Sequence, residues 1–406
     1  MTSYVEARRI LIQAAEARAA AVPLLHERVA LAGSLGRVLA ETLLADRDAP
    51  PFDRATRDGF AVRAADVASV PATLSLTGEV RAGKHFSGTV APGQCVQIMT
   101  GAPVPAGADA VVMIEYTESA PGSVVIRRSV APGENIVPLG SEARGGGEIL
   151  RAGTRLGYAE LAIAAQFGHE HVSVFFRPRV AILSTGDEIV PVSATPGPFQ
   201  IRNSNSSSLA AQVAQAGGIP VPLGPVADET TKLRMYIEEG LASDALVISG
   251  GVSAGKYDLV KKVLRELRGV TLFDSVAIRP GRPAIFVMCQ EKPVLGLPGN
   301  PVSTMVTFEL FGVPLLDALS GAPPRPLPVL KARLLRAIKL KAALTHFLPA
   351  ELTWQDGEPF VAELTWQGSG DIAALARANC FLVIPESKLE WAANDWVSVL
   401  PRRDRV

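Results

Sequence analysis

ALVISGGVSAGKYD (245–258) decides the fold of this chain, together with VAILSTGDE (180–188) and PVLGLPGNPVS (293–303). Each stretch begins as a short apolar run without alternation, which is typical of a strand buried on both faces of a parallel sheet. Each run ends at a glycine-rich or acidic turn, and a helical pattern follows. This repeated unit predicts a doubly wound α/β domain whose ligand lies at the carboxyl ends of the strands.

Composition limits the class of protein. The chain has 406 residues, a length typical of about three domains. Lysine plus arginine and aspartate plus glutamate number 40 each, so no global charge or basic run favours nucleic acid, and no segment has the pattern of a membrane span. The three cysteines (Cys95, Cys289 and Cys380) are far apart, which argues against disulfides or a cysteine zinc site and predicts a cytoplasmic protein.

The texture of the sequence predicts four domains. Residues 1–45 and 146–175 are expected to form one discontinuous helical domain, with 4–45 predicted to be helices broken near Pro23 and Gly33. Residues 46–145 alternate short β-prone runs with turns and predict a β insert domain. Residues 176–325 carry the α/β series, and 326–406 predict a C-terminal β-barrel. Helices in the α/β series are expected at 207–216, 230–241, 259–267 and 302–319.

Four acidic residues follow predicted strands or begin predicted helices: Asp187, Glu188, Asp228 and Asp258. In a doubly wound sheet these positions converge on one rim, where several carboxylates repel one another unless they share a cation. Carboxylates beside phosphate-binding loops favour Mg²⁺. Each residue alone has a structural alternative, since Asp228 could cap the helix after it and Asp258 could complement a helix dipole.

Two turns have the composition of anion-binding loops. The first contains Ser249, Gly250, Gly251, Ser253 and Gly255, and its glycines and hydroxyls suit an anion nest, although an ordinary strand-to-helix turn explains it equally simply. The second is AIRPGRP (277–283). Its residues Arg279 and Arg282 lie on a proline-stiffened turn suited to oxyanions, and solvated surface arginines are the alternative.

The string LPGNPVS (297–303) places Asn300 at a helix N-cap and Pro301 at the first helical position, which is a sufficient structural explanation. The functional alternative is that Pro298 and Pro301 hold Gly299 and Asn300 rigidly against a ligand.

Six strings together carry a family resemblance: DGFAV from Asp58, MTGAPVPAGADAVV from Met99, STGDE from Ser184, SGGVSAGKYD from Ser249, AIRPGRP from Ala277 and LPGNPVS from Leu297. In this order they resemble the molybdopterin molybdenumtransferases, the MoeA family that includes the E domain of gephyrin. The resemblance runs from about Val5 to the end of the chain.

The resemblance implies an elongated, four-domain homodimer whose third domain is a three-layer, molybdopterin-binding α/β structure. The implied reaction places molybdate onto the dithiolene of adenylylated molybdopterin, cleaves the adenylate and releases AMP, with Mg²⁺ required. It also allows association with other enzymes of molybdenum cofactor synthesis.

The resemblance also implies roles for particular residues. Asp187, Glu188, Asp228 and Asp258 match the functional acids of the family, with Asp228 and Asp258 as the metal and phosphate pair. The loop at 249–255 would hold the phosphate, and 298–301 would shape the pterin and nucleotide cleft. Asp58 and Thr100 would reach the cleft of the other subunit. Ser369 matches the residue that the C-terminal barrel contributes to the cleft.

Several residues depart from the pattern of the family. Lys256 replaces an acid, Val137 replaces an arginine, and Arg279 and Arg282 replace lysines. An arginine expected near Phe347 is missing from the barrel, where Leu348, Pro349 and Ala350 stand instead. These departures make a paralogue that uses another oxyanion, such as tungstate, one alternative. A molybdopterin adenylyltransferase is a second, because a related single-domain fold makes the adenylylated pterin, and a non-catalytic scaffold that holds cofactor intermediates is a third, by analogy with the E domain of gephyrin.

Overall fold

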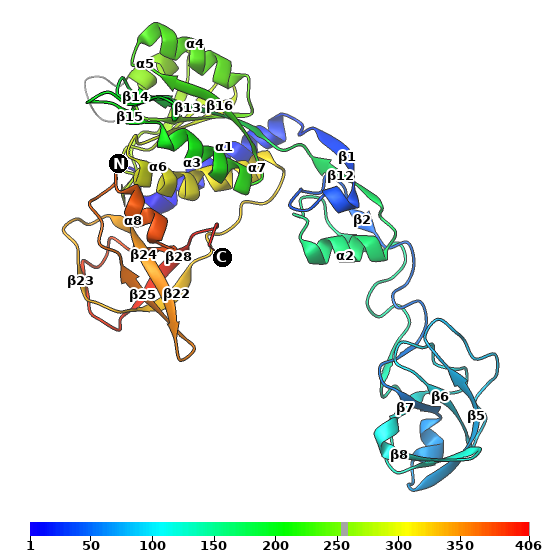
Figure 1. The fold of residues 1–406 in the computed structure, drawn as a ribbon. Coiled ribbons are helices and arrows are strands. Elements are labelled where there is room, and N and C mark those ends of the chain that lie inside the picture. Colours follow the sequence, from blue (N-terminus) through cyan, green and yellow to red (C-terminus); the bar gives the residue numbers. More distant parts are fainter. Residues whose placement is uncertain (253–258, 406) are drawn as a thin grey trace.

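The computed structural model describes residues 1–252 and 259–405 of the chain. The molecule is elongated, with a thick body at one end and a long extension at the other (Figure 1). We call residues 26–175 the arm, and we call residues 1–21 together with the described residues from 179 onward the body. The chain passes from body to arm after its first helix and returns at the start of the α/β series.

The body contains a mixed six-stranded sheet in which β16, β13, β17 and β21 are parallel, whereas β20 is antiparallel to both of its neighbours, β21 and β18. The bounds are β13 (Arg179–Thr185), β16 (Ile219–Val226), β17 (Ala245–Ser249), β18 (Val270–Phe273), β20 (Ile285–Cys289) and β21 (Lys292–Leu297). The three quoted stretches form neighbouring parallel strands, which confirms the predicted α/β class. The sheet is mixed rather than wholly parallel, because Gln290 and Glu291 both adopt positive φ and turn β20 back into β21 as a hairpin.

Helices cover both faces of this sheet, so the domain has three layers. The cluster around Leu233, Ile237 and Val260 packs α4 (Thr230–Leu241) and α5 (Leu259–Glu266) on one face. The other face carries α3 (Ser204–Gln215), α6 (Pro301–Thr307) and α7 (Val313–Leu319), with one π-helical turn at Phe308–Gly312. The run Pro301–Leu319 is long and apolar enough to cross a membrane, but 94% of its most apolar window is buried as a core helix of this layer.

The first helix, α1 (Tyr4–Ala21), begins at its N-cap Ser3 and buries Ala7, Leu11 and Ala15 in the core of the α/β domain, where it contacts α7. The helices expected between Pro23 and residue 45, on both sides of Gly33, were wrong. Residues from His26 form β1 (His26–Ala30), a 3₁₀ turn at Leu31–Gly33 and β2 (Leu43–Leu44). Pairing of β1 with β12 (His171–Phe175) overrides the weak helical periodicity there.

The arm has two parts. Next to the body, β1 pairs with β12 and β2 pairs with β11 (Glu148–Leu150), and α2 (Tyr158–Gln166) covers them. Farther out, a curled six-stranded sheet has the order β7-β4-β6-β5-β9-β8 and apolar clusters on both faces. Its strands are β4 (Gly59–Val62), β5 (Ala72–Val80), β6 (Gln94–Ile98), β7 (Ala110–Met113), β8 (Thr117–Ala120) and β9 (Ser123–Ile126).

The C-terminal part is a closed five-stranded barrel, as predicted. Closure follows because β24 pairs with both β25 and β26, while β22 and β28 complete the ring. Its strands are β22 (Leu330–Leu334), β24 (Thr345–Gln355), β25 (Glu358–Glu363), β26 (Cys380–Ile384) and β28 (Trp396–Pro401). The short helix α8 (Ile372–Arg377) was not expected from the sequence. The predicted domain boundaries at 46–145, 176–325 and 326–406 stay predictions.

Candidate functional site

A cavity of about 420 Å³ lies where β13, β17 and β21 end, and we call it the strand-end cavity. All three quoted stretches contribute to its lining. The predicted residues that line it are Glu188, Asp228, Ser249, Gly250, Gly251, Pro298, Gly299, Asn300 and Pro301. The parallel register brings these residues together, because the strands end at the same edge of the sheet.

The glycines after β17 allow the loop to approach β13 closely. Gly250 has φ of +93°, and a Cβ atom there would lie 2.4 Å from the carbonyl oxygen of Thr185. Gly251 has φ of +62°, and its Cβ would lie 2.7 Å from the side chain of Val260. Both positions therefore require glycine, and the loop backbone forms the wall of the cavity itself.

The acidic residues form a small hydrogen-bonded group at the rim. Asp228 accepts a short hydrogen bond from the hydroxyl of Thr185, and its backbone N–H donates to Asp187 Oδ1 at 3.0 Å. The helix-capping alternative for Asp228 was wrong, because Glu229 is the N-cap residue of α4. Asp187 does not line the cavity, but it fixes the turn that presents Asp228 and Glu188.

Asn300 occupies the N-cap position of α6, but its side chain makes no capping hydrogen bond. Its amide instead donates to Ser369 Oγ of the barrel at 2.8 Å, and the backbone N–H of Val302 donates to the carbonyl oxygen of Ser369 at 2.9 Å. The hydroxyl of Thr304 donates to the carbonyl oxygen of Pro298 and fixes the turn from inside. The side chain of Asn300 therefore joins the α/β domain to the barrel and does not cap α6, while the ligand-binding role of the string stays a prediction.

A second cavity, of about 1010 Å³, lies between the α/β domain and the barrel, and we call it the arginine cavity. Arg279 and Arg282 line it from one side and Ser369 lines it from the other. Both arginines are exposed, and neither guanidinium has a hydrogen bond or ion pair with any residue the structure describes. Pro298 and Asn300 line both cavities, so the two spaces adjoin.

Several polar residues that line the strand-end cavity were not predicted from the sequence, among them Ser184, Asn203 and Asn205. The hydroxyl of Ser184 contacts Ser249 Oγ at 3.0 Å and Asn203 Oδ1 at 3.1 Å, and all three side chains are buried. Asn205 donates to the carbonyl oxygen of Gly299 at 2.8 Å. The contact of Ser184 with Ser249 depends on the register of β13 with β17, which no local pattern gives. The clue was the string IRNSN (201–205), which places two asparagines just before a predicted helix.

Asp58 directly precedes β4 and Thr100 follows β6, so both belong to the outer sheet of the arm, which lies far from the α/β domain and the barrel (Figure 1). Neither residue lines either cavity of the same chain. They contact each other, because Asp58 accepts hydrogen bonds from the backbone and the hydroxyl of Thr100. The hydrogen bond from the backbone N–H of Thr100, and to a lesser extent the one from its hydroxyl, lowers the pKa of Asp58 below its usual range. One chain therefore does not bring these two residues to the predicted cleft.

Ser253, Gly255, Lys256 and Asp258 lie outside the described residues. In the part of the chain that the structure describes, no group of three or more histidine, cysteine, aspartate or glutamate residues could hold a metal ion. Where the resemblance predicted an arginine of the barrel, Leu348, Pro349 and Ala350 are all buried.

Comparison with known proteins covers nearly the whole chain. Residues 2–168 match the MoeA N-terminal region (domains I and II), 181–318 match a probable molybdopterin-binding domain, and 331–401 match the MoeA C-terminal region (domain IV). The chain belongs to the MoeA family. The family resemblance predicted from the six strings is therefore confirmed.

Two relatives illustrate the likeness, and both are named molybdopterin molybdenumtransferase. The Bacillus subtilis protein is 36% identical over 388 residues, which are 93% of this chain and 90% of that protein. The protein from a Nostoc species is 37% identical over 369 residues, which are 88% and 85% of the two chains. MoeA-family proteins of this name are transferases of molybdenum cofactor biosynthesis, and this chain is an enzyme of that family.

Solved structures agree with the assignment to the MoeA family. One crystal structure of the molybdopterin biosynthesis MoeA protein from Pyrococcus horikoshii covers 96% of this chain and 98% of that one, with TM-score 0.71 and 33% identity. A second structure of the protein from that organism covers 99% and 100%, with TM-score 0.80 and 28% identity.

Proposed function

We propose that this enzyme inserts molybdate into adenylylated molybdopterin and releases AMP. The observation that carries the proposal is the adjacency of two different anion sites. The strand-end cavity presents a glycine loop beside carboxylates, and the arginine cavity presents two guanidinium groups that have no ion pair among the described residues. A substrate with a pyrophosphate at one end and a sulfur ligand for an oxyanion near the other end fits across both.

The strand-end cavity suits the adenylate. Backbone at Gly250 and Gly251 contacts the phosphates, and Ser249, held by Ser184, adds an oriented hydroxyl. The arginine cavity suits molybdate, because guanidinium groups bind tetrahedral oxyanions through paired N–H donors. Asn300 and Ser369 lie between the two and position the pterin.

Mg²⁺ fits the oxygens at the rim. Magnesium is usually held by one or two carboxylates together with substrate phosphates, and Asp228 and Glu188 both line the cavity where a phosphate would lie. Asp228 would be the ligand among the described residues, with Asp258 as its proposed partner. When bound, the ion would neutralise charge on the phosphates. Asp187 and Thr185 would orient the Asp228 carboxylate for it.

We also propose a homodimer, because Asp58 and Thr100 can act only in the cleft of a second copy if they act at the site at all. The arm carries them well away from the body (Figure 1). The cytoplasmic location stays a prediction from cysteine usage, and association with other cofactor enzymes stays a prediction from the resemblance. The preference for molybdate over tungstate is likewise a proposal.

The test uses the pure protein with adenylylated molybdopterin, molybdate and Mg²⁺, with AMP measured by chromatography. Release of AMP that depends on molybdate supports the proposal. Net consumption of ATP with free molybdopterin would instead indicate the adenylyltransferase, and binding of the adenylylated pterin without any AMP release would indicate the scaffold.

A variant pair sharpens the assignment of the acids. Asp228→Asn should greatly reduce AMP release, whereas Asp244→Asn removes an acid of the same domain whose carboxylate accepts from the backbone N–H of Arg179, outside both cavities. Equal loss in both variants would argue against a specific role for Asp228.

A further inference from the structure

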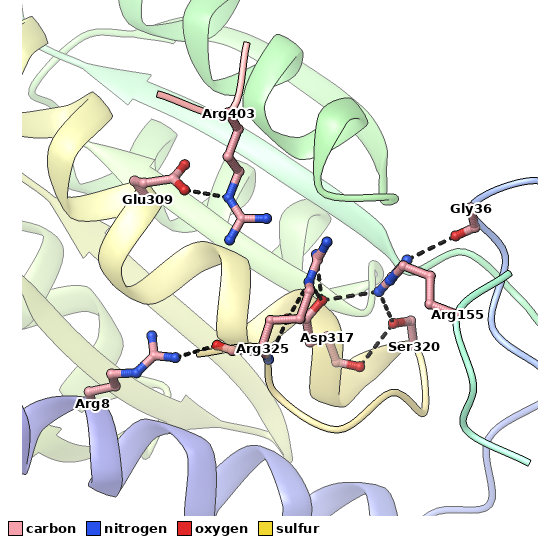
Figure 2. A network of polar contacts seen from close by, with 8 residues as sticks. All are labelled: Arg8, Gly36, Arg155, Glu309, Asp317, Ser320, Arg325 and Arg403. Atoms are coloured by element: carbon pink, nitrogen blue, oxygen red, sulfur yellow. Dashed lines mark hydrogen bonds and ion pairs between the residues drawn. The ribbon is translucent and has the colours of Figure 1, made fainter. Parts of the chain in front are cut away.

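A buried carboxylate lies where the arm meets the body. Asp317 of α7 is completely buried, and its carboxylate accepts hydrogen bonds from two arginines, Arg155 at 162 positions away in the chain and Arg325 at eight (Figure 2). Arg155 Nη2 donates to it at 3.0 Å, and Arg325 donates through Nη2 at 2.6 Å, through Nε and through its backbone N–H at 3.0 Å. One side chain of the α/β domain thus accepts from the arm and from the linker to the barrel.

The two arginines are themselves anchored. Arg155 also donates to the carbonyl oxygen of Gly36 at 2.9 Å, so it is fixed to two segments of the arm. The carbonyl oxygen of Arg325 accepts from Arg8 Nη2 of α1 at 2.7 Å. Nearby, Arg403 pairs with the buried Glu309 (Figure 2). The contacts of Asp317 therefore connect the arm, the α/β domain and the approach to the barrel.

A second, independent contact lies beside this carboxylate. Gly321 has φ of +75°, and a Cβ atom there would lie 2.5 Å from the ring of Phe175 in the arm. A Cβ on Gly153 of the arm would lie 3.3 Å from the carbonyl oxygen of Gly321. The backbones of the arm and the body therefore lie very close together here. We use the term joint for these glycine contacts together with the ion pair between Asp317 and Arg155.

The chain itself does not fix the angle of the arm. It passes between arm and body only twice, near Leu25 and near Phe176, where one backbone hydrogen bond joins the two passages. A cavity of about 580 Å³ lies beside these passages and is lined mostly by apolar atoms of residues such as Leu24 and Phe176. Two short passages beside a cavity permit bending. The joint supplies the restraint.

We propose that Asp317 is the positioning residue for the arm, and that it sets the orientation in which the arm is presented to a second copy of this chain. A buried carboxylate that loses a cation partner is strongly disfavoured, so the joint selects one geometry rather than a range. A small change of angle at Asp317 becomes a large displacement of Asp58 and Thr100 at the far end of the arm. The catalytic consequence rests on the proposed function, whereas the orientation itself does not.

The experiment measures arm orientation directly. Spin labels are attached to cysteines introduced at the exposed positions Ser119 of the arm and Glu238 of the body, and labelled chains are diluted into unlabelled ones. The native cysteines are all buried and do not interfere. Arg155→Met removes the arm side of the joint. Arg151→Met is the matched control, because Arg151 lies in the same loop, its side chain is 82% exposed and it pairs only with Glu148 among the described residues.

The expected result is a broader distance distribution in Arg155→Met than in the wild type and in Arg151→Met. AMP release should fall about tenfold or more, since displacement of catalytic groups by about an ångström has effects of that size. Affinity for AMP should stay unchanged, because the strand-end cavity lies in the body. Arg155→Lys should recover part of the turnover, which loss of folding would not allow.

Gly321→Ala tests the same idea without removing a charge. It introduces a clash with Phe175, whereas Gly357→Ala has nearly the same φ, +82°, with nothing within 4 Å. Unchanged distances in both Arg155→Met and Gly321→Ala would overturn the proposal. Broader distances with normal turnover would overturn its catalytic half. If the wild type releases no AMP, the proposed function fails, and the distances still decide whether Asp317 orients the arm.

Discussion

Asp58 and Thr100 form a single hydrogen-bonded unit, although 42 positions separate them in the sequence. Asp58 Oδ1 accepts from the backbone N–H of Thr100 at 2.6 Å and from its hydroxyl at 2.8 Å. These bonds lower the pKa of the Asp58 carboxyl, so the arm presents a carboxylate that is ionised at neutral pH. The two sequence strings that begin near these residues thus converge on one group.

Thr100→Val should raise the pKa of Asp58 toward its ordinary value, because one of the two hydrogen bonds is lost. Because the pKa of Asp58 is lowered in the folded protein, the ionised carboxylate stabilises the fold at pH values above its ordinary pKa. This stabilisation is lost as the pH falls through the lowered pKa. Thr100→Val should bring the pKa in the folded protein closer to the ordinary value and so narrow the pH range over which this stabilisation is lost. Carbon-detected NMR titration of the Asp58 carboxyl measures it, and Thr100→Ser is the control that keeps the hydroxyl. An identical titration in Thr100→Val would contradict the assignment.

Gly250→Ala should abolish AMP binding, since its Cβ would lie 2.4 Å from the carbonyl oxygen of Thr185 and the loop must move. Gly224→Ala on β16 is the comparison, because Gly224 also has positive φ, +86°, but has nothing within 4 Å. That control should lose about 1 kcal/mol of stability through backbone strain and still bind AMP. Calorimetric titration with AMP distinguishes the two. Normal binding by Gly250→Ala would show that the loop is not the phosphate site.

Arg282→Ala should raise the molybdate concentration needed for half-maximal AMP release by about 10- to 100-fold, as expected for a lost charge-assisted hydrogen bond. Affinity for the pterin substrate should change less, because Arg282 lines only the arginine cavity. Arg282→Lys, which keeps the charge without the planar fork, should lie between the two. A larger effect on pterin binding than on molybdate would contradict the oxyanion role.

The cysteines should be inert in the folded protein. Burial raises the pKa of Cys95 to about 11 and that of Cys380 to about 12, so little reactive thiolate exists at pH 8. Mass spectrometry after iodoacetamide treatment should find all three cysteines unmodified, and all three modified after unfolding in urea. Rapid labelling of Cys380 in the native protein would mean that the barrel opens locally.

Local patterns predicted much of the fold. The helix expected at 230–241 has the bounds found for α4, Thr230–Leu241, because its amphipathic pattern is local and strong. The three apolar runs became neighbouring parallel strands for the same reason. The β20–β21 hairpin and strand β1 were not predicted, since a turn of Gln290 and Glu291 carries no glycine signal and β1 depends on pairing with distant β12.

The candidate site could be predicted where residues of the required chemical types lie close together in the sequence, as in the glycine loop and the acids near Asp187. Contacts created by the register of the sheet were not. Ser184 and Ser249 are 65 positions apart, and Arg155 and Asp317 are 162 apart, so only the folded chain shows that they touch. Asn300 shows that a correct local prediction can still miss the side-chain contact. It occupies the N-cap position of α6 as predicted, but its side chain donates a hydrogen bond to Ser369 instead of capping the helix.

The short strand β19 (Ile278–Arg279) leaves the α/β domain and pairs in parallel with β24 of the barrel. The turn that carries Arg279 and Arg282 is therefore hydrogen-bonded into the neighbouring structural unit. In a chimera of two relatives that exchanges everything after residue 326, the barrel would come from one protein and the turn from the other. The pairing of β19 with β24 would then join two sequences that do not match. A workable crossover must move residues 278–279 together with the barrel, even though some fifty residues of sequence separate them.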